Sequence, residues 1–208
     1  MTDTTLSPEH AAQRLGRVTA SRIADVMATT KNGWSASRQN YRAELIAERL
    51  TGVQAARFVS KEMLHGIGTE PHARAAYEFR FDCDVQPGGF WLHPLYDMAG
   101  ASPDGLIGAD GLVEFKCPST ATHLDTLLGQ PFDKRYIDQC QWQMACTGRE
   151  WCDLASFDPR LPESMRLFVK RIVRDEKRIA ELEQAVKVFL GEIETIVAEL
   201  KGKYEEAA

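Results

Sequence analysis

The sequence lacks paired cysteines. It has five cysteines, an odd number, and no two of them form a C-x-x-C pair. Cysteines in such number and spacing are typical of a cytosolic protein, in which they stay reduced, rather than of a secreted protein with disulfides. The sequence therefore predicts a cytoplasmic protein with free thiols at Cys83, Cys117, Cys140, Cys146 and Cys152.

Long apolar runs are also missing. No stretch approaches the roughly 20 apolar residues that a membrane-spanning helix needs. The first residues lack a basic region followed by an apolar run, so we expect no secretory signal and no membrane partner. With 208 residues, 44% of them hydrophobic, the chain can bury a substantial core. No repeat, low-complexity tract or linker interrupts it, so we expect one domain over residues 1–208.

An overall excess of positive charge is absent, because the formal net charge is −5. Residues 175–208 hold nine acidic and five basic side chains, however, and residues 1–174 hold 21 acidic and 20 basic ones. Before position 43, six basic residues face only three acidic ones: Arg14, Arg17, Arg22, Lys31, Arg38 and Arg42 against Asp3, Glu9 and Asp25. A basic entrance on a nearly neutral body is compatible with a phosphate-backbone ligand but does not require one.

Hydrophobic periodicity predicts helices at both ends of the chain and strands in its middle. Caps and glycines place short helices up to Arg14 and from Thr19 or Ser21 to Met27, and another from about Tyr41 to the Thr51-Gly52 stop. A longer helix begins at Lys61 or Glu70 and ends at Phe81. The remaining expected helices are 121–128, 134–147 and 175–201, and the expected strands are 85–93, 97–101, 105–107, 112–116, 151–157 and 165–173. This order predicts an α/β or α+β fold with a central mixed β-sheet flanked by helices.

The last expected helix carries one apolar stripe along residues 175–201. The stripe consists of Ile179, Leu182, Val186, Phe189, Ile193, Ile196 and Leu200. Such spacing is typical of a long amphipathic helix, and packing on the core of the same domain is its commonest use.

The segment ASPDGLIGADGLVEFKCP, residues 101–118, concentrates charge on two expected strands joined by a glycine-containing turn. On a strand, Glu114 and Lys116 project together, and Phe115 points to the other side. Two carboxylates, Asp104 and Glu114, with a lysine are what a magnesium-dependent phosphodiesterase needs, because the carboxylates hold the cation and the lysine orients the attacking water. Spacing alone leaves open a surface hairpin with ordinary charges. The bulky apolar neighbours of Glu114 favour a buried strand, where an unpaired carboxylate would be costly.

Three further polar residues have two interpretations each. Glu70 either serves a site or simply stabilises the first turn of a helix. Tyr136 and Gln139 share one face of an expected helix, from which Gln141 is rotated away. Amides at these positions suit a phosphate oxygen or a metal-bound water, but glutamines at the edge of a core are equally common.

Four motifs in order resemble the phage lambda exonuclease family (YqaJ-type viral recombinases and alkaline exonucleases) of the PD-(D/E)xK nuclease superfamily. RLGRVTAS resembles the family's opening RLG-x-[IV]-T-A-S, and Glu70 falls at its helix glutamate. SPDG with EFKCP resembles its metal and lysine signature, and YIDQCQWQMACTGR resembles its Y-x-x-Q-x-Q-x-x-M-x-x-T segment. The match covers residues 14–175. It implies a restriction-endonuclease-like fold.

The resemblance also implies a role for each matching residue of the catalytic centre. Asp104, Glu114 and the backbone carbonyl of Phe115 would bind Mg²⁺, with two ions expected per site and Mn²⁺ as an alternative metal. Lys116 would hold and polarise the attacking water. Glu70 would act in the outer shell of the metal or as an additional ligand, and Gln139 with Tyr136 would support the site.

A second set of implied roles concerns the DNA. Arg14, Ser21 and Ser102 would bind the terminal 5′ phosphate, which suits a guanidinium fork and two hydroxyls. Met63 matches an apolar wedge that unpairs the duplex end, but a core methionine is the commoner use. Lys31 aligns with an arginine that follows the DNA groove, and lysine keeps that charge but not the planar fork.

The resemblance implies a magnesium-dependent 5′→3′ double-strand DNA exonuclease that releases mononucleotides from 5′-phosphorylated ends and leaves a 3′ single strand. It also implies a phage or prophage origin, a homotrimeric ring around DNA and a single-strand annealing protein as partner. Two alternatives stay open: a single-strand or structure-specific nuclease of the same superfamily, and a non-catalytic DNA-end-binding module. The iron–sulfur branch is disfavoured because the cysteines lack the spacing for a cluster.

Overall fold

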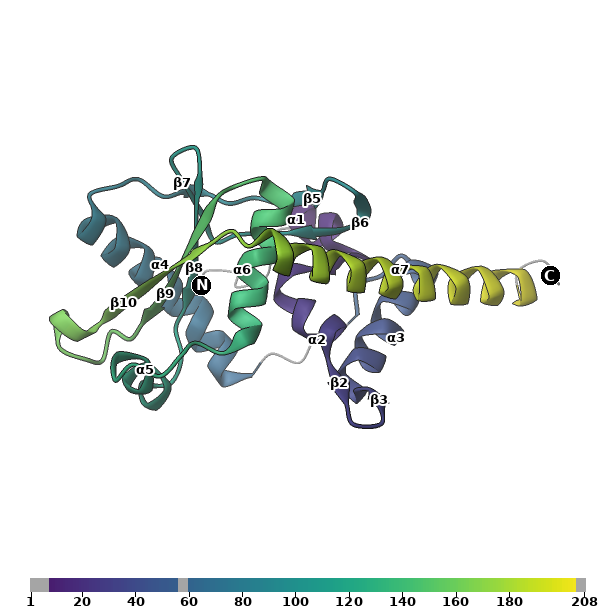
Figure 1. Cartoon of the computed structure of the whole chain (residues 1–208), viewed down its shortest axis with the longest axis horizontal. Coiled ribbons are helices and arrows are strands. Elements are labelled where there is room, and N and C mark those ends of the chain that lie inside the picture. Colours follow the sequence, from purple (N-terminus) through teal and green to yellow (C-terminus); the bar gives the residue numbers. More distant parts are fainter. Residues whose placement is uncertain (1–7, 56–59, 205–208) are drawn as a thin grey trace.

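The computed structural model describes residues 8–55 and 60–204. Its main sheet has five strands in the order β10-β9-β8-β7-β4. This sheet lies on the left in Figure 1. Strands β8 and β9 run parallel, and the other neighbouring pairs run antiparallel. The expected mixed sheet is therefore confirmed. Its strands are β4 (Gln86–Pro87), β7 (Gly105–Ile107), β8 (Gly111–Lys116), β9 (Trp151–Phe157) and β10 (Leu167–Val173).

The parallel pair requires a crossover, because the end of β8 and the start of β9 lie at opposite ends of these neighbouring strands. The connection contains two helices, α5 (Thr120–Leu127) and α6 (Lys134–Thr147). In the resulting register Glu114 pairs with Leu154 and Lys116 with Ser156.

Helices cover both faces of this sheet. Helix α4 (Lys61–Phe81) packs on one face, where Tyr77 meets Val113 and Phe115 of β8. On the other face, Met144 of α6 packs with Leu112 and neighbouring apolar residues. Since side chains alternate along a strand, the even-numbered residues of β8 point toward α6. This alternation confirms the expected orientation of Glu114 and Lys116 and directs both at one helix.

A second core lies beyond α6, and most of its residues come from the N-terminal and C-terminal parts of the chain. It is built around a small sheet in the order β1-β6-β5 and around the long C-terminal helix. Trp142 of α6 is buried in this core, so α6 joins the two halves of the fold. The elements here are α1 (Pro8–Arg14), β1 (Val18–Thr19), a 3₁₀ turn at Ala20–Arg22, α2 (Ile23–Met27), the hairpin β2 (Thr29–Thr30) and β3 (Gly33–Trp34), α3 (Ala36–Thr51), β5 (Trp91–His93), β6 (Tyr96–Ala101) and α7 (Glu176–Tyr204). A further 3₁₀ turn, Glu163–Met165, precedes β10.

Capping residues set the bounds of two helices. The Ser35 hydroxyl accepts from the N–H of Arg38 at the start of α3, and Gly52 ends this helix with φ 68°, as expected. Ser60 caps α4 in the same way. Because α4 therefore begins at Lys61, Glu70 lies in the helix interior, and the first-turn interpretation of Glu70 does not apply.

Two sequence-based expectations are wrong. Residues 85–93 do not form one strand: they divide into β4 and β5, which belong to different sheets. Gly89, with φ 66°, turns the chain between them. Neither Thr19 nor Ser21 caps α2, which starts at Ile23 after the 3₁₀ turn, and Thr19 makes no side-chain capping bond.

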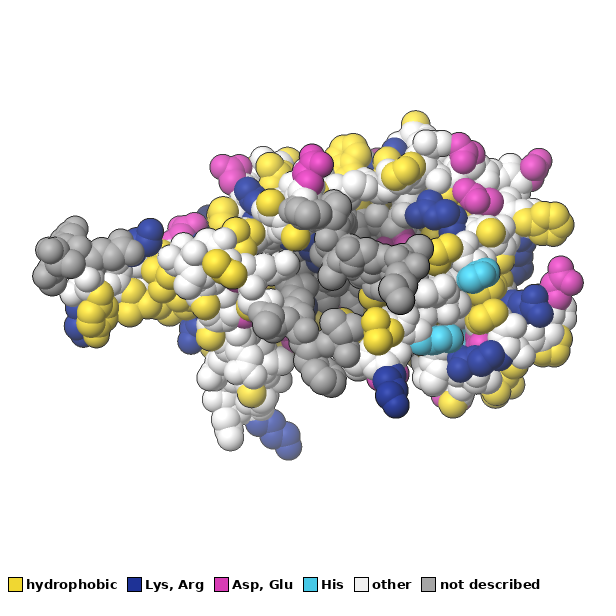
Figure 2. All heavy atoms as spheres, turned by 180° about the vertical axis from the view of Figure 1, so that it is seen from behind, with side chains coloured by type: hydrophobic (Ala, Val, Ile, Leu, Met, Phe, Trp, Pro, Cys, Tyr) yellow, Lys and Arg dark blue, Asp and Glu magenta, His cyan; other side chains and the backbone are white. Residues whose placement is uncertain are grey.

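Helix α7 has 29 residues and is the longest element. Its buried side chains end at Ile193, and beyond that point the helix projects from the body (Figure 1). Hydrophobic side chains gather along one side of the projecting end in Figure 2. The stripe expected to pack on the core does so only over its first part. No helix among the described residues is long and apolar enough to cross a membrane.

Candidate active site

Strand β8 presents two charged side chains to α6. Lys116 Nζ lies 2.7 Å from Glu114 Oε1. The Glu114 side chain is only 4% exposed, whereas that of Lys116 is 20% exposed. A buried carboxylate needs hydrogen-bond partners or a counter-charge, and Lys116 supplies both.

Asp104 reaches the same place from the turn between β6 and β7. Its Oδ2 accepts a hydrogen bond of 2.7 Å from the backbone N–H of Phe115, which ties the turn to β8. Arg74 of α4 holds the turn from the other side, since its guanidinium donates to the Asp104 carbonyl and to the Val85 carbonyl. The chain also packs tightly behind the turn: a Cβ on Gly88 would lie 1.8 Å from the Pro103 carbonyl oxygen. Residue 88 must therefore be glycine for this turn to form.

Helix α6 completes the surroundings of Glu114 with two amides. Gln139 Nε2 donates to Glu114 Oε1 over 2.6 Å, and Gln139 Oε1 accepts from Lys116 Nζ over 3.1 Å. Gln143, one helical turn further, donates from Nε2 to Glu114 Oε2 over 2.6 Å. Both oxygens of Glu114 are thus held by fixed donors.

Burial and neighbouring carboxylates raise the pKa of Asp104 and of Glu70. Burial raises the pKa of Asp104 well above its usual value, and the charges of Glu114 and Glu70 raise it further. Burial and Glu114 likewise raise the pKa of Glu70, against the opposing charge of Arg74. Burial would lower the pKa of Lys116, but Glu114 and Asp104 outweigh it and raise this pKa. The site therefore gathers more negative charge than one ammonium group balances.

A cleft of about 440 Å³ contains most of the residues singled out from the sequence. In its wall, Arg14 Nη1 donates to the Ser102 hydroxyl over 2.9 Å, although the two residues are 88 positions apart. Ser21 lines the same cleft. The predicted residues that line the cleft together are Arg14, Ser21, Glu70, Ser102, Asp104, Glu114, Lys116 and Gln139.

Four predicted residues do not line this cleft. Phe115, predicted to contribute only its backbone carbonyl, is one of them, and its side chain packs in the core with Tyr77. Tyr136 lines a neighbouring cleft that meets the first at Lys116, and Lys116 Nζ lies 4.7 Å from the centre of the Tyr136 ring. Met63 is 49% exposed in the first turn of α4, so the structure excludes a core methionine there. Lys31 is exposed in the turn between β2 and β3. The DNA roles of Lys31 and Met63 stay predictions.

The residues of the cleft fit a magnesium ion by their chemistry. No group of three or more His, Cys, Asp or Glu side chains stands in metal-binding geometry within residues 8–55 and 60–204. The available side-chain set is the pair Asp104 and Glu114, and Mg²⁺ is commonly held by one or two carboxylates while water fills its other positions. A divalent cation would also compensate the surplus negative charge described above.

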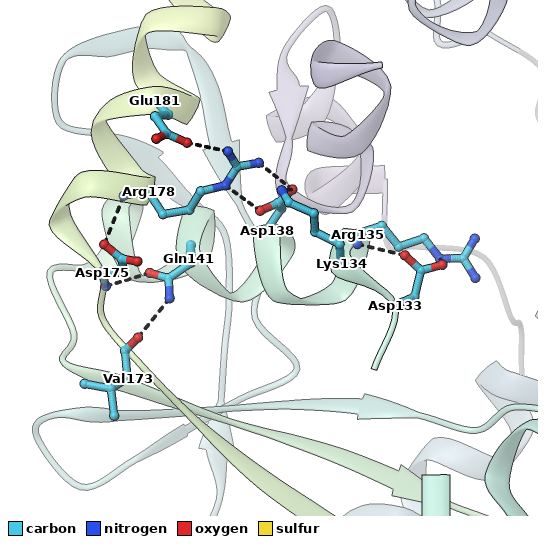
Figure 3. Close-up of polar contacts among 9 residues, drawn as sticks. All are labelled: Asp133, Lys134, Arg135, Asp138, Gln141, Val173, Asp175, Arg178 and Glu181. Atoms are coloured by element: carbon cyan, nitrogen blue, oxygen red, sulfur yellow. Dashed lines mark hydrogen bonds and ion pairs between the residues drawn. The ribbon is translucent and has the colours of Figure 1, made fainter. Parts of the chain in front are cut away.

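Sequence reasoning missed two residues of the site. No sequence pattern indicates a role for Arg74, because that role depends on backbone carbonyls of a turn distant in the sequence. Gln143 stands four residues after Gln139, so helical spacing places both on one face, and this signal was available. Gln141, in contrast, points away to Val173 and Asp175, as the same spacing predicts (Figure 3).

Comparison with known proteins agrees with this geometry. The crystal structure of an alkaline exonuclease, LHK-Exo from Laribacter hongkongensis, superposes with a TM-score of 0.89 at 50% sequence identity, covering 97% of this chain and 100% of that chain. The structure of LHK-Exo in complex with dAMP gives the same values. A phage-related exonuclease from Haemophilus somnus 129PT shares the fold alone, with a TM-score of 0.68 and 12% identity over 88% of this chain and 96% of that chain.

No curated protein matches the chain. The model of the YqaJ-like viral recombinase domain family matches residues 9–150, which include α1 except its first residue, the Asp104 turn, β8 and all of α6. The resemblance to lambda-type exonucleases and the restriction-endonuclease-like α/β fold are therefore confirmed. The chain belongs to the YqaJ-like viral recombinase domain family.

Proposed function

We propose that the protein is a magnesium-dependent 5′→3′ exonuclease that acts on double-stranded DNA with 5′-phosphorylated ends. It would release 5′-mononucleotides and leave a 3′ single strand for annealing-type recombination. The observation that carries the proposal is the shared cleft, which is lined both by the Arg14–Ser102 pair and by the carboxylate–lysine group. The 50% identical relative is an exonuclease, which supports the same reaction class.

In this mechanism each side chain of the group has one task. Asp104 and Glu114, with the Phe115 carbonyl, would hold Mg²⁺, which supplies Lewis-acid stabilisation of the charge that develops on the phosphate oxygens. Lys116 would orient and polarise the attacking water from its position beside Glu114. Gln139 links the two, since it donates to Glu114 and accepts from Lys116.

The Arg14–Ser102 pair and Ser21 would recognise the substrate terminus. A guanidinium with neighbouring hydroxyls binds a dianionic phosphate through charge-assisted hydrogen bonds. Arg14, Ser102 and Ser21 offer this combination. The complex of LHK-Exo with dAMP supports the assignment, because that relative binds a nucleotide of the kind that the reaction would release.

The proposal can be tested with the variant Arg14→Ala and a duplex labelled at both termini, with one 5′ phosphate. We expect the variant to digest the phosphorylated strand roughly 10- to 100-fold more slowly, because the phosphate loses a charged partner worth about 1.5 to 3 kcal/mol. Its rate on a 5′-hydroxyl end should change little. The labels report the direction of digestion in the same experiment.

Arg17→Ala is the matched control. Arg17 lies three residues later, beyond the end of α1, and donates to the carbonyls of Asp97 and Gln13, outside the cleft. We expect Arg17→Ala to leave the preference for phosphorylated ends intact. An equal loss on phosphate and hydroxyl ends in Arg14→Ala would contradict the phosphate pocket, and release from 3′ ends would contradict the polarity.

We further propose that the enzyme works as a homotrimer around DNA, together with a single-strand annealing protein that loads on the exposed strand. The apolar side of the projecting end of α7 supports the first proposal, since apolar surface beyond the core is typical of subunit contacts.

A further inference from the structure

Gln143 is a buried amide that touches the catalytic carboxylate from behind. It is 0% exposed and does not line the cleft. Its Nε2 lies 2.6 Å from Glu114 Oε2, a short hydrogen bond to a carboxylate oxygen. A substrate in the cleft therefore meets Glu114, Lys116 and Gln139, whereas Gln143 lies behind Glu114 and donates to it.

The orientation of the Gln143 amide follows from its two neighbours. The Glu114 carboxylate only accepts hydrogen bonds, so the Nε2 end of the amide must face it. At the other end, the Gln143 Oε1 accepts from the thiol of Cys152 on β9, whose Sγ lies 3.9 Å away. The buried thiol of Cys152 is therefore compatible with this orientation.

The donors around Glu114 are distributed unequally over its two oxygens. Oε1 accepts from both Lys116 and Gln139, which occupies its two lone pairs. Oε2 accepts from Gln143 alone. One lone pair on Oε2 therefore has no protein donor among the described contacts, and Gln143 fixes the plane of the carboxylate that carries it.

We propose that Gln143 is a positioning residue for the metal ion: it locks Glu114 in the rotamer and orientation that bind a divalent cation. The inference deepens the proposed function, since it rests on Glu114 as a metal ligand, and it adds Gln143 to the site. An outer donor that orients a ligating carboxylate typically contributes roughly 10- to 100-fold to metal affinity.

The test is calorimetric titration of the DNA-free protein with Mn²⁺, with Gln143→Met as the variant. Methionine keeps the length of the side chain and is apolar, so it fills the same buried space without a donor. We expect Mn²⁺ to bind roughly 10- to 100-fold more weakly. Excess Mn²⁺ should restore most of the turnover number, because Gln143 does not touch the substrate.

Gln141→Met is the matched control. Gln141 lies on the same helix, is 3% exposed, and its amide bridges the Val173 carbonyl and the Asp175 N–H (Figure 3). Its replacement should lower the melting temperature and leave the affinity for Mn²⁺ unchanged. Gln143→Asn is a second variant in case the methionine protein does not fold. It retains a buried amide one methylene too short to hold Glu114, and it too should weaken Mn²⁺ binding.

Three outcomes would overturn the inference: unchanged Mn²⁺ affinity in a folded Gln143 variant, an equal loss of affinity in Gln141→Met, or no Mn²⁺ binding by the parent protein. Failure of the proposed function is distinguishable from these. Suppose that Gln143→Met binds Mn²⁺ more weakly than the parent protein, but the parent protein does not degrade DNA ends. The inference then stands, and the exonuclease proposal is contradicted.

Discussion

Lys116 shows how strongly a single side chain can be constrained. Its ammonium group donates to Glu114 and Gln139 and lies over the Tyr136 ring, so residues of two elements, β8 and α6, determine its position. It also lies where the two neighbouring clefts meet. A lysine held in this way can present a water molecule to a phosphate without further rearrangement.

We expect Lys116→Ala to lose nuclease activity by at least about 100-fold, the usual contribution of a group that activates an attacking water. Release of mononucleotides from linear duplex DNA with Mg²⁺ measures this loss. Lys134→Ala is the control, because that lysine is 69% exposed and pairs with Asp138 on the same helix. Parental activity in Lys116→Ala would instead favour the non-catalytic DNA-end-binding module.

At the scale of elements, the strand and the helix that hold the proposed catalytic residues were predictable from the sequence. Alternation on β8 placed Glu114 and Lys116 on one side, and helical spacing separated Gln139 from Gln141. What could not be predicted depends on contacts between distant segments. The split of residues 85–93 follows from the approach of Gly88 to the Pro103 carbonyl, and the role of Arg74 follows from carbonyls in two other loops. Neither contact leaves a periodic pattern in the sequence.

Helices α6 and α7 are joined by the buried carboxylate of Asp138. Arg178 of α7 donates to it from Nε and Nη2 over 2.7 Å and 2.8 Å, and Lys134 donates over 2.8 Å (Figure 3). Burial raises the pKa of Asp138, but these two cations outweigh it and lower the pKa below its usual value. The charged carboxylate is therefore bound more tightly in the folded state than in the unfolded chain.

This lowered pKa predicts an acid dependence of stability. The contribution of Asp138 is fully present above the ordinary carboxyl pKa of 3.8 and is lost as the pH falls through the lower folded-state value. We expect Asp138→Asn to reduce the free energy of unfolding at pH 7 by about 1.5 to 3 kcal/mol, as for other hydrogen bonds to charged groups. The difference between parent and variant should shrink below pH 3.8, as measured by urea unfolding at several pH values.

Glu181→Gln serves as the comparison for this experiment. Glu181 pairs with the same arginine over 2.6 Å, but its side chain is 49% exposed. An exposed ion pair contributes at most about 1 kcal/mol. A loss in Glu181→Gln as large as that in Asp138→Asn would contradict the assignment to the buried carboxylate.

At the scale of the whole molecule, the projecting end of α7 bears on assembly. Beyond Ile193, Ile196 and Leu200 remain partly exposed and Tyr204 is 64% exposed, all on one side of the helix. We expect the protein to sediment at about three times the 23.3 kDa of one chain. We also expect Leu200→Glu to shift it toward smaller species, because a charge placed in an apolar contact is costly.

Ala198→Glu provides the control for assembly. It introduces the same charge at an exposed position on the other side of α7. Sedimentation of this variant should match that of the parent. A parent protein that sediments as a single chain would contradict the trimer proposal.

The parallel pairing of β8 with β9 has a consequence for the newly made protein. Glu114 and Lys116 lie on a strand whose second neighbour comes some forty residues later, after both helices of the crossover. Arg14 in turn meets its partner only after Ser102 has been synthesised. A chain still emerging from the ribosome therefore has no assembled site until Phe157 is available to the sheet. The topology therefore delays assembly of the site until at least the first 157 residues have been synthesised.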